Sequence, residues 1–445
     1  MTDPVASFIR AACVPRNAHN AGTLEEAEKI LAEHPYVAQS SVHTAAILAN
    51  EDSVREFLSR DRGNATATGG PYGWDALCHL CFSRYLRLDT ARADAFVRTA
   101  RALIDSGASA KTGWYETIDQ PNPMPAFESA IYGAAGVAQH AGVTRLLIER
   151  GADPNDEETP YHVPESDDNT VMAILVESGR LNSASLACML LRKTDWHDLD
   201  GLRLLLEHHA DPRQMTIWGE NALHHAIRRD NRLEMIESLM EFGADATLPN
   251  GRDGRTAVAM AARRGRADVL AMFERRGIHL NLQGVDRLIA ACATNDRDAV
   301  RSSAGDPRVV AELVNLGGTL LAEFAGTGNA AGVGNLLDCG VSPVSVYEEG
   351  DAYFGIAGQS TALHVAAWRA QPEVVKALIA RGAPVHAKDG KGRTALELAV
   401  KACVDSYWTW RRSPDSVRAL LEAGASPADI VVPCGYDDVD TLLRG

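Results

Sequence analysis

The residues best suited to chemistry in this sequence are histidines and carboxylates in two neighbouring segments. His162 and Glu165 lie in the stretch ETPYHVPESDDN, and Asp195 and His197 lie in the stretch KTDWHDLDG. A histidine close to a carboxylate can act as a general base with an orienting partner. These four residues therefore predict the acid–base chemistry of a hydrolase or lyase, provided that their side chains converge in a closed pocket.

Some of these residues also have a simpler structural use. Asp195 and Asp198 precede an apolar helical stretch, and capping such a helix is the commoner role of aspartate there. Cys78 and Cys81 form a C-x-x-C pattern, but they lie inside an apolar helical pattern that indicates buried thiols. No zinc-ligand spacing, phosphate-binding loop or nucleophile elbow occurs. The sequence thus predicts no metal and no cofactor, so any enzyme would be metal-independent.

The composition disfavours several classes of partner. The chain has 44 Lys and Arg against 59 Asp and Glu, a net charge of −15, which gives no general attraction to nucleic acid or anionic lipid. No run of eighteen apolar residues predicts a membrane span, and the N-terminal stretch lacks the pattern of a secretory signal. Eight scattered cysteines in 445 residues are typical of buried thiols. We therefore expect a cytoplasmic protein without nucleic-acid or membrane partners.

The elements that must position these residues repeat along the chain. The phrase TALHVAAWRAQPEVVKALIARGAPV begins at Thr361, and its opening returns 33 residues later at Thr394. Threonine can cap a first helix, the alanine pair lets two helices approach closely, and Gly382 can end a second helix in the left-handed conformation. Further copies cover residues 129–155, 221–246 and 255–278, and weaker ones cover 41–60, 75–110, 185–212, 285–300 and 319–341.

This phrase and its period resemble those of the ankyrin-repeat family. The resemblance implies an all-α solenoid of about ten helix-pair units, several of them degenerate, with enlarged loops between the units. Because one unit cannot bury its apolar face alone, we expect residues 1–445 to form a single continuous array. We place an N-terminal capping unit at 1–39, the repeats at 40–427 and a C-terminal cap at 428–445. Ankyrin arrays, by this resemblance, bind partners rather than catalyse reactions.

One unit departs strongly from the phrase. The stretch 157–168 falls where a first helix is due, and Thr159-Pro160 is a good helix start, but Pro164 would interrupt the helix four residues later. We therefore expect the first half of this unit to be a loop that opens the concave face.

Aromatic and acidic residues gather in enlarged loops at 111–127, 157–168 and 345–355. Exposed aromatics among polar groups are typical of binding surfaces, although they could also seal the ends of the stack. The candidate ligand-binding residues of these loops are Trp114, Tyr115, Glu116, Tyr161, His162, Glu165 and Tyr347.

Basic residues recur at the ends of the first helices of three consecutive units. They are Arg192 with Lys193, Arg228 with Arg229, and Arg263 with Arg264, and the resemblance places them on the concave face. Such cations could offset helix dipoles, pair with the acidic loops, or bind an anionic or carboxylate-bearing ligand.

The sequence favours a binding protein that presents its concave face and loops to a protein, peptide or small-molecule partner. The predicted site is bounded by the loops at 111–127 and 157–168 and by residues 192–198, with Trp114 or Trp196 for an apolar group. The alternative is an enzyme that uses His162, Glu165, Asp195 and His197 in the same pocket. His224 and His364 match the repeated phrase, so we expect them to be structural. Trp408 and Trp410 occupy a long turn at the opposite end of the helices, where we expect a local lid or an oligomer contact.

Overall fold

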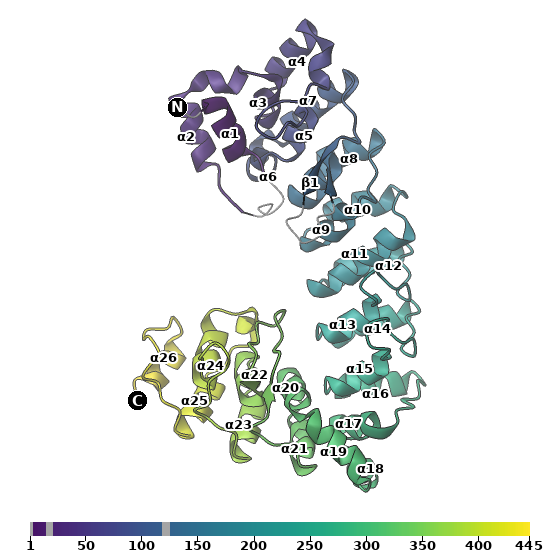
Figure 1. Ribbon diagram of the computed structural model, residues 1–445, viewed down its shortest axis with the longest axis vertical. Coiled ribbons are helices and arrows are strands. Elements are labelled where there is room, and N and C mark those ends of the chain that lie inside the picture. The colour runs from purple at the N-terminus through teal and green to yellow at the C-terminus, as the bar shows by residue number, and fades with distance from the viewer. Residues whose placement is uncertain (1–2, 15–20, 118–124) are drawn as a thin grey trace. The chain divides into compact units, whose positions relative to one another are not determined.

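Helix pairs joined by short turns make up most of the structure, a computed structural model that describes residues 3–14, 21–117 and 125–445 (Figure 1). Two small antiparallel sheets of two strands each are added to the described helices. The predicted all-α class is confirmed. The chain divides into two compact units, which are described separately. Unit 1 comprises Met1–His225 with Ser238–Ala244, and unit 2 comprises Ala226–Glu237 with Asp245–Gly445.

Unit 1 is built from successive helix pairs. Helix α3 packs on α5 and α4 packs on α7, and the same pairing continues from α7 to α8, from α8 to α10 and from α9 to α11. Each helix therefore buries its apolar face against a neighbouring pair. The helices are α1 (Pro4–Ala12), α2 (Glu25–Glu33), the 3-10 helix η2 (Pro35–Gln39), α3 (Val42–Ile47), α4 (Glu51–Arg60), the 3-10 helix η3 (Arg62–Ala65), α5 (Ala76–Cys81), α6 (Arg84–Leu88), the 3-10 helix η4 (Thr90–Arg92), α7 (Ala93–Asp105), the π-helix η5 (Tyr132–Val137), α8 (Ala141–Glu149), α9 (Glu158–His162), the 3-10 helix η6 (Val163–Glu165), α10 (Thr170–Glu177), α11 (Ser183–Asp195) and α12 (Leu199–Glu207).

The residues of α13 (Ala222–Arg228) and α14 (Leu233–Glu241) are divided between the two units. In unit 2, α22 packs on both α20 and α24, and α23 packs on both α21 and α25. The other helices of unit 2 are α15 (Ala257–Arg263), α16 (Ala267–Arg275), α17 (Gly284–Thr294), α18 (Arg297–Ser303), α19 (Pro307–Asn315), α20 (Gly317–Thr327), α21 (Ala330–Asp338), α22 (Ala362–Trp368), α23 (Pro372–Ala380), α24 (Ala395–Val404), the 3-10 helix η7 (Tyr407–Arg411), α25 (Asp415–Glu422) and α26 (Asp437–Leu443).

The residues of the repeated phrase have the structural roles that their types predict. Ala366 and Ala367 are buried between helices, and Gly382 has a φ of +81° after α23. His364 joins the capping box of α22, where its Nδ1 lies 2.8 Å from the Thr361 hydroxyl. Its Nε2 reaches the Ala387 carbonyl oxygen at 3.0 Å in the following loop. This histidine therefore ties one unit to the loop of the next, and the predicted structural role of His364 is confirmed.

The expectation that the first half of the degenerate unit is a loop is wrong, because a shortened helix remains there. Helix α9 spans Glu158–His162 and continues into η6, whose first turn accepts Pro164 because the missing N–H group is not needed at that position. The predicted cap at Thr159 is also wrong. Asp156 performs this function, since its Oδ1 accepts the Thr159 backbone N–H at 2.7 Å.

Two of the enlarged loops contain strands. Strand β1 (Gly113–Thr117) pairs antiparallel with β2 (Pro125–Ser129), so that Trp114 lies opposite Glu128 and Tyr115 opposite Phe127. Positions 118–124 of this predicted loop lie outside the described residues. In unit 2, β3 (Val346–Tyr347) pairs with β4 (Ser360–Thr361) directly before α22. These hairpins fix the aromatic residues of both loops on a defined backbone.

No single helix of the described residues has the length and apolar character needed to cross a membrane, although the bent pair α19 and α20 meets that test by length and composition alone.

Candidate binding site

A chain of aromatic rings runs through unit 1 and joins two of the predicted loops. Phe82 and Tyr132, in the middle of the chain, are almost completely buried. Trp114 is half-buried and stacks on the buried Trp74, which favours the sealing role for this residue. The successive ring centroids are 4.9 Å apart for Trp74–Trp114, 6.0 Å for Trp114–Phe82, 5.9 Å for Phe82–Tyr132, 5.3 Å for Tyr132–His162, 4.9 Å for His162–Tyr161 and 5.8 Å for Tyr161–Trp218.

Charged groups accompany the aromatic chain where α9, η6 and α11 meet. The ring of His162 lies between two carboxylates, 3.2 Å from Glu158 and 3.1 Å from Glu165. Arg192 binds Glu165 at 2.8 Å and also pairs with Asp195. The guanidinium of Arg192 lies 4.1 Å from the centre of the Tyr161 ring. This arrangement fixes Tyr161 in place by a cation–π contact and by the largely buried ion pairs of Arg192.

The surroundings of His162 determine its protonation. Burial alone would lower its pKa, but the hydrogen bonds with Glu158 and Glu165 outweigh burial and raise the pKa to about 9. His162 is therefore a cation at neutral pH. A protonated imidazole cannot accept a proton, so the predicted role of general base does not suit the arrangement around this residue.

The predicted residues of the segment 192–198 have different roles in the structure. Asp195 ends α11 and lies 3.0 Å from Nε2 of His225, so the prediction that Asp195 caps the next helix is wrong. Asp198 does cap α12, because its Oδ1 accepts the Gly201 N–H at 2.9 Å. Its other oxygen accepts the buried ammonium of Lys193 at 2.7 Å. His197 lies in the turn between these helices with a φ of +54°.

An apolar turn lies at the end of the aromatic chain, and it was not predicted from the sequence. Ile217 is 93% exposed, and Met215 and Trp218 are also exposed. The turn is held by the Thr216 N–H, which donates to the Glu220 carbonyl at 2.9 Å, and by Gly219, whose N–H donates to Thr216 at 3.0 Å. We call Met215, Ile217 and Trp218 the apolar tip. The signal in the sequence was the string MTIW, which places three large apolar residues in a loop.

The remaining predicted residues of unit 1 lie nearer the surface. Tyr115 is exposed on β1 and packs on Phe127, with the ring centroids 5.0 Å apart. Glu116 follows it on the same strand. Trp196 is exposed at the end of α11.

In unit 2, the predicted arginines contact side chains of this chain. Arg263 pairs with Asp286 at 2.6 Å, and the guanidinium of Arg229 lies 3.7 Å from the centre of the Tyr353 ring. Arg228 is the last residue of α13. Tyr347 on β3 has a raised pKa, because it is partly buried and lies near the carboxylates of Glu323 and Asp351. For Arg192 and Arg263, pairing with acidic residues is therefore the arrangement observed.

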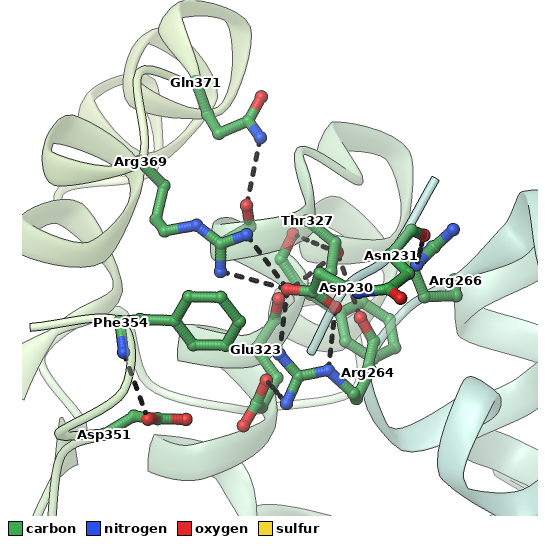
Figure 2. Close-up of polar contacts among 12 residues, drawn as sticks. Asp230, Asn231, Arg264, Arg266, Glu323, Thr327, Asp351, Phe354, Arg369 and Gln371 are labelled. Carbon is green, nitrogen blue, oxygen red and sulfur yellow. Dashed lines mark hydrogen bonds and ion pairs between the residues drawn. The ribbon is translucent and has the colours of Figure 1, made fainter. Parts of the chain in front are cut away.

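A second polar cluster lies in unit 2, and of its residues only Arg264 was among the predicted basic residues (Figure 2). Asp230 accepts two hydrogen bonds from Arg264, each of 2.8 Å, and two from Arg369, each of 3.0 Å. Arg264 also pairs with Glu323 at 2.9 Å. We call these four residues the Asp230 cluster. Arg264 and Arg369 are buried, and the side chain of Asp230 is only 7% exposed. The two arginines lower the pKa of Asp230 well below its usual range, although burial would raise it.

Arg369 also joins the loop at 345–355 to the long turn that contains Trp408. Its guanidinium lies 4.1 Å from the centre of the Phe354 ring and 4.4 Å from that of Trp408 (Figure 2 shows Phe354 beside it). The prediction that Trp408 lies at the far end from the enlarged loops is therefore wrong for this loop. Among the residues that the structure describes, no group of His, Cys, Asp and Glu could hold a metal ion.

Comparisons with known proteins agree with the repeats. Residues 184–284 match a family model of ankyrin repeats (3 copies), and residues 336–399 match one of ankyrin repeats (many copies). A crystal structure of the human ASB11 ankyrin repeat domain is 20% identical, covers 60% of this chain and 98% of that one, and has a TM-score of 0.26. No curated protein matches the chain. Ankyrin repeats are generally protein-interaction modules. The two matched segments and the repeated capped helix pairs show that this chain contains ankyrin repeats.

Proposed function

We propose that the protein binds a partner protein through unit 1 and that the apolar tip is the central contact. The observation that carries the proposal is the exposure of Ile217 at 93%, beside the exposed Met215 and Trp218. Contiguous apolar side chains on a surface commonly mark an interaction site. Burying such side chains contributes roughly 25 cal/mol for each Å² of apolar surface removed from water. A partner segment with an apolar side chain of its own would gain this stabilisation.

The groups behind the tip favour a rigid surface. Trp218 contacts Tyr161, and Tyr161 is held by Arg192 through the cation–π contact and a hydrogen bond from Nε to its carbonyl oxygen at 3.2 Å. Arg192 is itself fixed by Glu165 and Asp195. A surface that is already ordered loses less conformational entropy when a partner binds, which strengthens binding.

These contacts also favour a protein segment over a small anionic ligand. The guanidinium of Arg192 already contacts two carboxylates, so an added anion would have to displace one of them. The acid–base alternative has weaker support for a related reason, since His162 is held as a cation between Glu158 and Glu165. We therefore assign the charged groups a positioning role for the aromatic residues.

The test is a comparison of partners recovered from the native cells by three forms of the full chain. The forms are the wild type, the tip variant Ile217→Ser with Trp218→Ala, and the control Val431→Ser, which removes another strongly exposed apolar side chain. We expect partners that the wild type and the control recover equally and that the tip variant loses. Quantitative mass spectrometry measures the recovery, and thermal unfolding verifies that all three are folded. Equal recovery of every partner by the folded tip variant would refute the proposal.

A further inference from the structure

The turn between α24 and α25 is much longer than the turn between α22 and α23. Between α22 and α23 the connection is Arg369 to Gln371, whereas here it runs from Asp405 to Pro414 and contains the 3-10 helix η7. An insertion of this size is not required by the stacking of the helix pairs. Its sequence YWTWR combines three aromatic residues with arginine, the residue types most enriched at the energetic centres of protein interfaces.

The aromatic residues and the arginine of η7 lie on two different faces of this helix. Side chains three residues apart lie on the same face of a 3-10 helix. Trp408 and Arg411 share the inner face, and Trp408 is only 6% exposed. Tyr407 and Trp410 share the outer face, where they are 58% and 71% exposed. The inner pair therefore anchors the insertion, while the outer pair is presented to solvent.

The anchoring of the inner face is extensive. The Trp408 ring packs on Arg369 at 4.4 Å and on Arg411 at 4.6 Å. Arg411 also donates a hydrogen bond to the Arg369 carbonyl oxygen. Ser406 caps η7, because its hydroxyl accepts the Trp408 N–H at 3.0 Å. The outer aromatic residues are therefore held on a fixed support rather than on a loose loop, and little conformational entropy would be lost when they bind.

The charge beside the outer face belongs to Arg412, which is exposed. Among the described residues no ion pair joins Arg412 to a carboxylate, although the chain as a whole has a net charge of −15. Arg412 lies over the ring of Tyr436 at 4.5 Å. Arg411 belongs to the inner face, where its Nε atom is buried. The guanidinium of Arg412 would therefore gain from a carboxylate supplied from outside.

We propose that Tyr407, Trp410 and Arg412 form a second docking surface, and that its partner is an acidic protein segment that also carries an apolar side chain. The apolar side chain would pack on the exposed rings of Tyr407 and Trp410. A carboxylate of the segment would bind the exposed guanidinium of Arg412. This surface belongs to unit 2 and does not depend on the function proposed for the apolar tip in unit 1.

An acidic protein segment fits this surface better than a nucleic acid does. Binding to a phosphate backbone depends on many cations acting together, and this surface offers the exposed Arg412 on a strongly acidic chain. The outer face instead combines a large aromatic area with few charges, as the centres of protein interfaces do.

The experiment is a selection of short random peptides displayed on phage, with the full-length protein as bait. We expect the enriched peptides to contain an excess of Asp and Glu together with at least one large apolar residue. A synthetic peptide of the most enriched sequence, labelled with a fluorophore, is then titrated with the wild type and with three variants. They are Trp410→Ala, Arg412→Gln and the control Tyr36→Ala, which removes an exposed aromatic residue elsewhere.

We expect Trp410→Ala to weaken peptide binding by about tenfold or more, as the loss of a central aromatic contact does. Arg412→Gln should weaken binding less and should reduce its dependence on salt, because the arginine contributes electrostatically. The control should bind like the wild type. Enriched peptides that bind Trp410→Ala as tightly as the wild type, or that are basic, would refute the proposal. So would a failure to enrich any peptide, or tighter binding of a single-stranded oligonucleotide of similar length.

Discussion

A single residue, Asp230, binds two buried arginines of unit 2, Arg264 and Arg369. Its φ is +51°, in the left-handed region that favours glycine, and the corresponding residue before α16 is Gly265. Aspartate is among the residues that tolerate this conformation, and here its carboxylate gains four hydrogen bonds from two arginines. A buried carboxylate of this kind stabilises the fold only while its partners remain in place.

We expect Arg369→Gln to lower the free energy of unfolding by about 3 kcal/mol, because it removes one of the two buried partners of Asp230. It also removes the guanidinium that contacts both Phe354 and Trp408. The matched control is Arg301→Gln, which breaks a fully solvated pair with Asp298 and should cost less than about 0.5 kcal/mol. Urea denaturation measures both changes. A similar cost for the two variants would show that the buried cluster contributes little.

The protonation of His162 should make stability depend on pH. Its pKa of about 9 in the folded protein lies above the usual value of 6.5. The stabilisation is therefore fully present below pH 6.5 and is lost as the pH rises through 9. The shift corresponds to at most about 3 kcal/mol. Urea denaturation between pH 6 and pH 10 should show this loss in the wild type and a flatter profile in His162→Gln. The exposed His386 provides the control His386→Gln, and if both variants follow the wild-type profile, His162 is not the group responsible.

At the scale of elements, the sequence predicts the helix pairs of the regular units but not the shortened helix of the irregular unit at 157–168. The period of 33 residues and the capping threonines indicate helix pairs such as α22 and α23, because capping and close alanine contacts are local effects. The sequence analysis missed the survival of α9, because it took Thr159 rather than Asp156 as the cap and did not foresee the 3-10 turn that accommodates Pro164. Propensity rules treat that proline as a helix breaker.

The candidate sites were predicted less completely than the elements, for a related reason. The contact of Arg192 with Tyr161 and Glu165 joins segments that lie close in the phrase, so aligning the units pointed to them. The contact of Arg369 with Asp230 joins residues 139 positions apart. Such a pair depends on how several units stack, which no local pattern reports.

The repeated histidine gives a prediction about one element. We expect His364→Ala to lower the free energy of unfolding by about 1–2 kcal/mol, because it removes hydrogen bonds to Thr361 and to the Ala387 carbonyl oxygen. His386→Ala, at an exposed position two residues after Pro384, should change it by less than about 0.5 kcal/mol. Thermal unfolding measures both. Full stability of His364→Ala would mean that the phrase keeps this histidine for another reason.

At the scale of the whole molecule, the central prediction is that stability comes from stacking between neighbouring units. The continuity of the array over residues 1–445 stays a prediction. Within unit 2, however, the contacts of α20 with α22 and of α21 with α23 show where one helix pair depends on the next. The Asp230 cluster adds a polar link, since Arg369 follows α22 directly.

Deletion of residues 360–445 should therefore destabilise what remains, not simply shorten it. The deletion removes α22 to α26, uncovers the apolar faces of α20 and α21, and takes Arg369 away from Asp230. We expect the truncated chain to aggregate or to unfold at a lower temperature, because a terminal unit needs a polar outer face. Fusion of a capping repeat with such a face after residue 359 should restore a soluble, folded chain. The control deletion of residues 428–445 removes only α26, which packs on α25, and should have a much smaller effect. Light scattering and thermal unfolding compare the three forms. A chain that ends at residue 359 and stays soluble and fully stable without a cap would mean that the units do not depend on their neighbours.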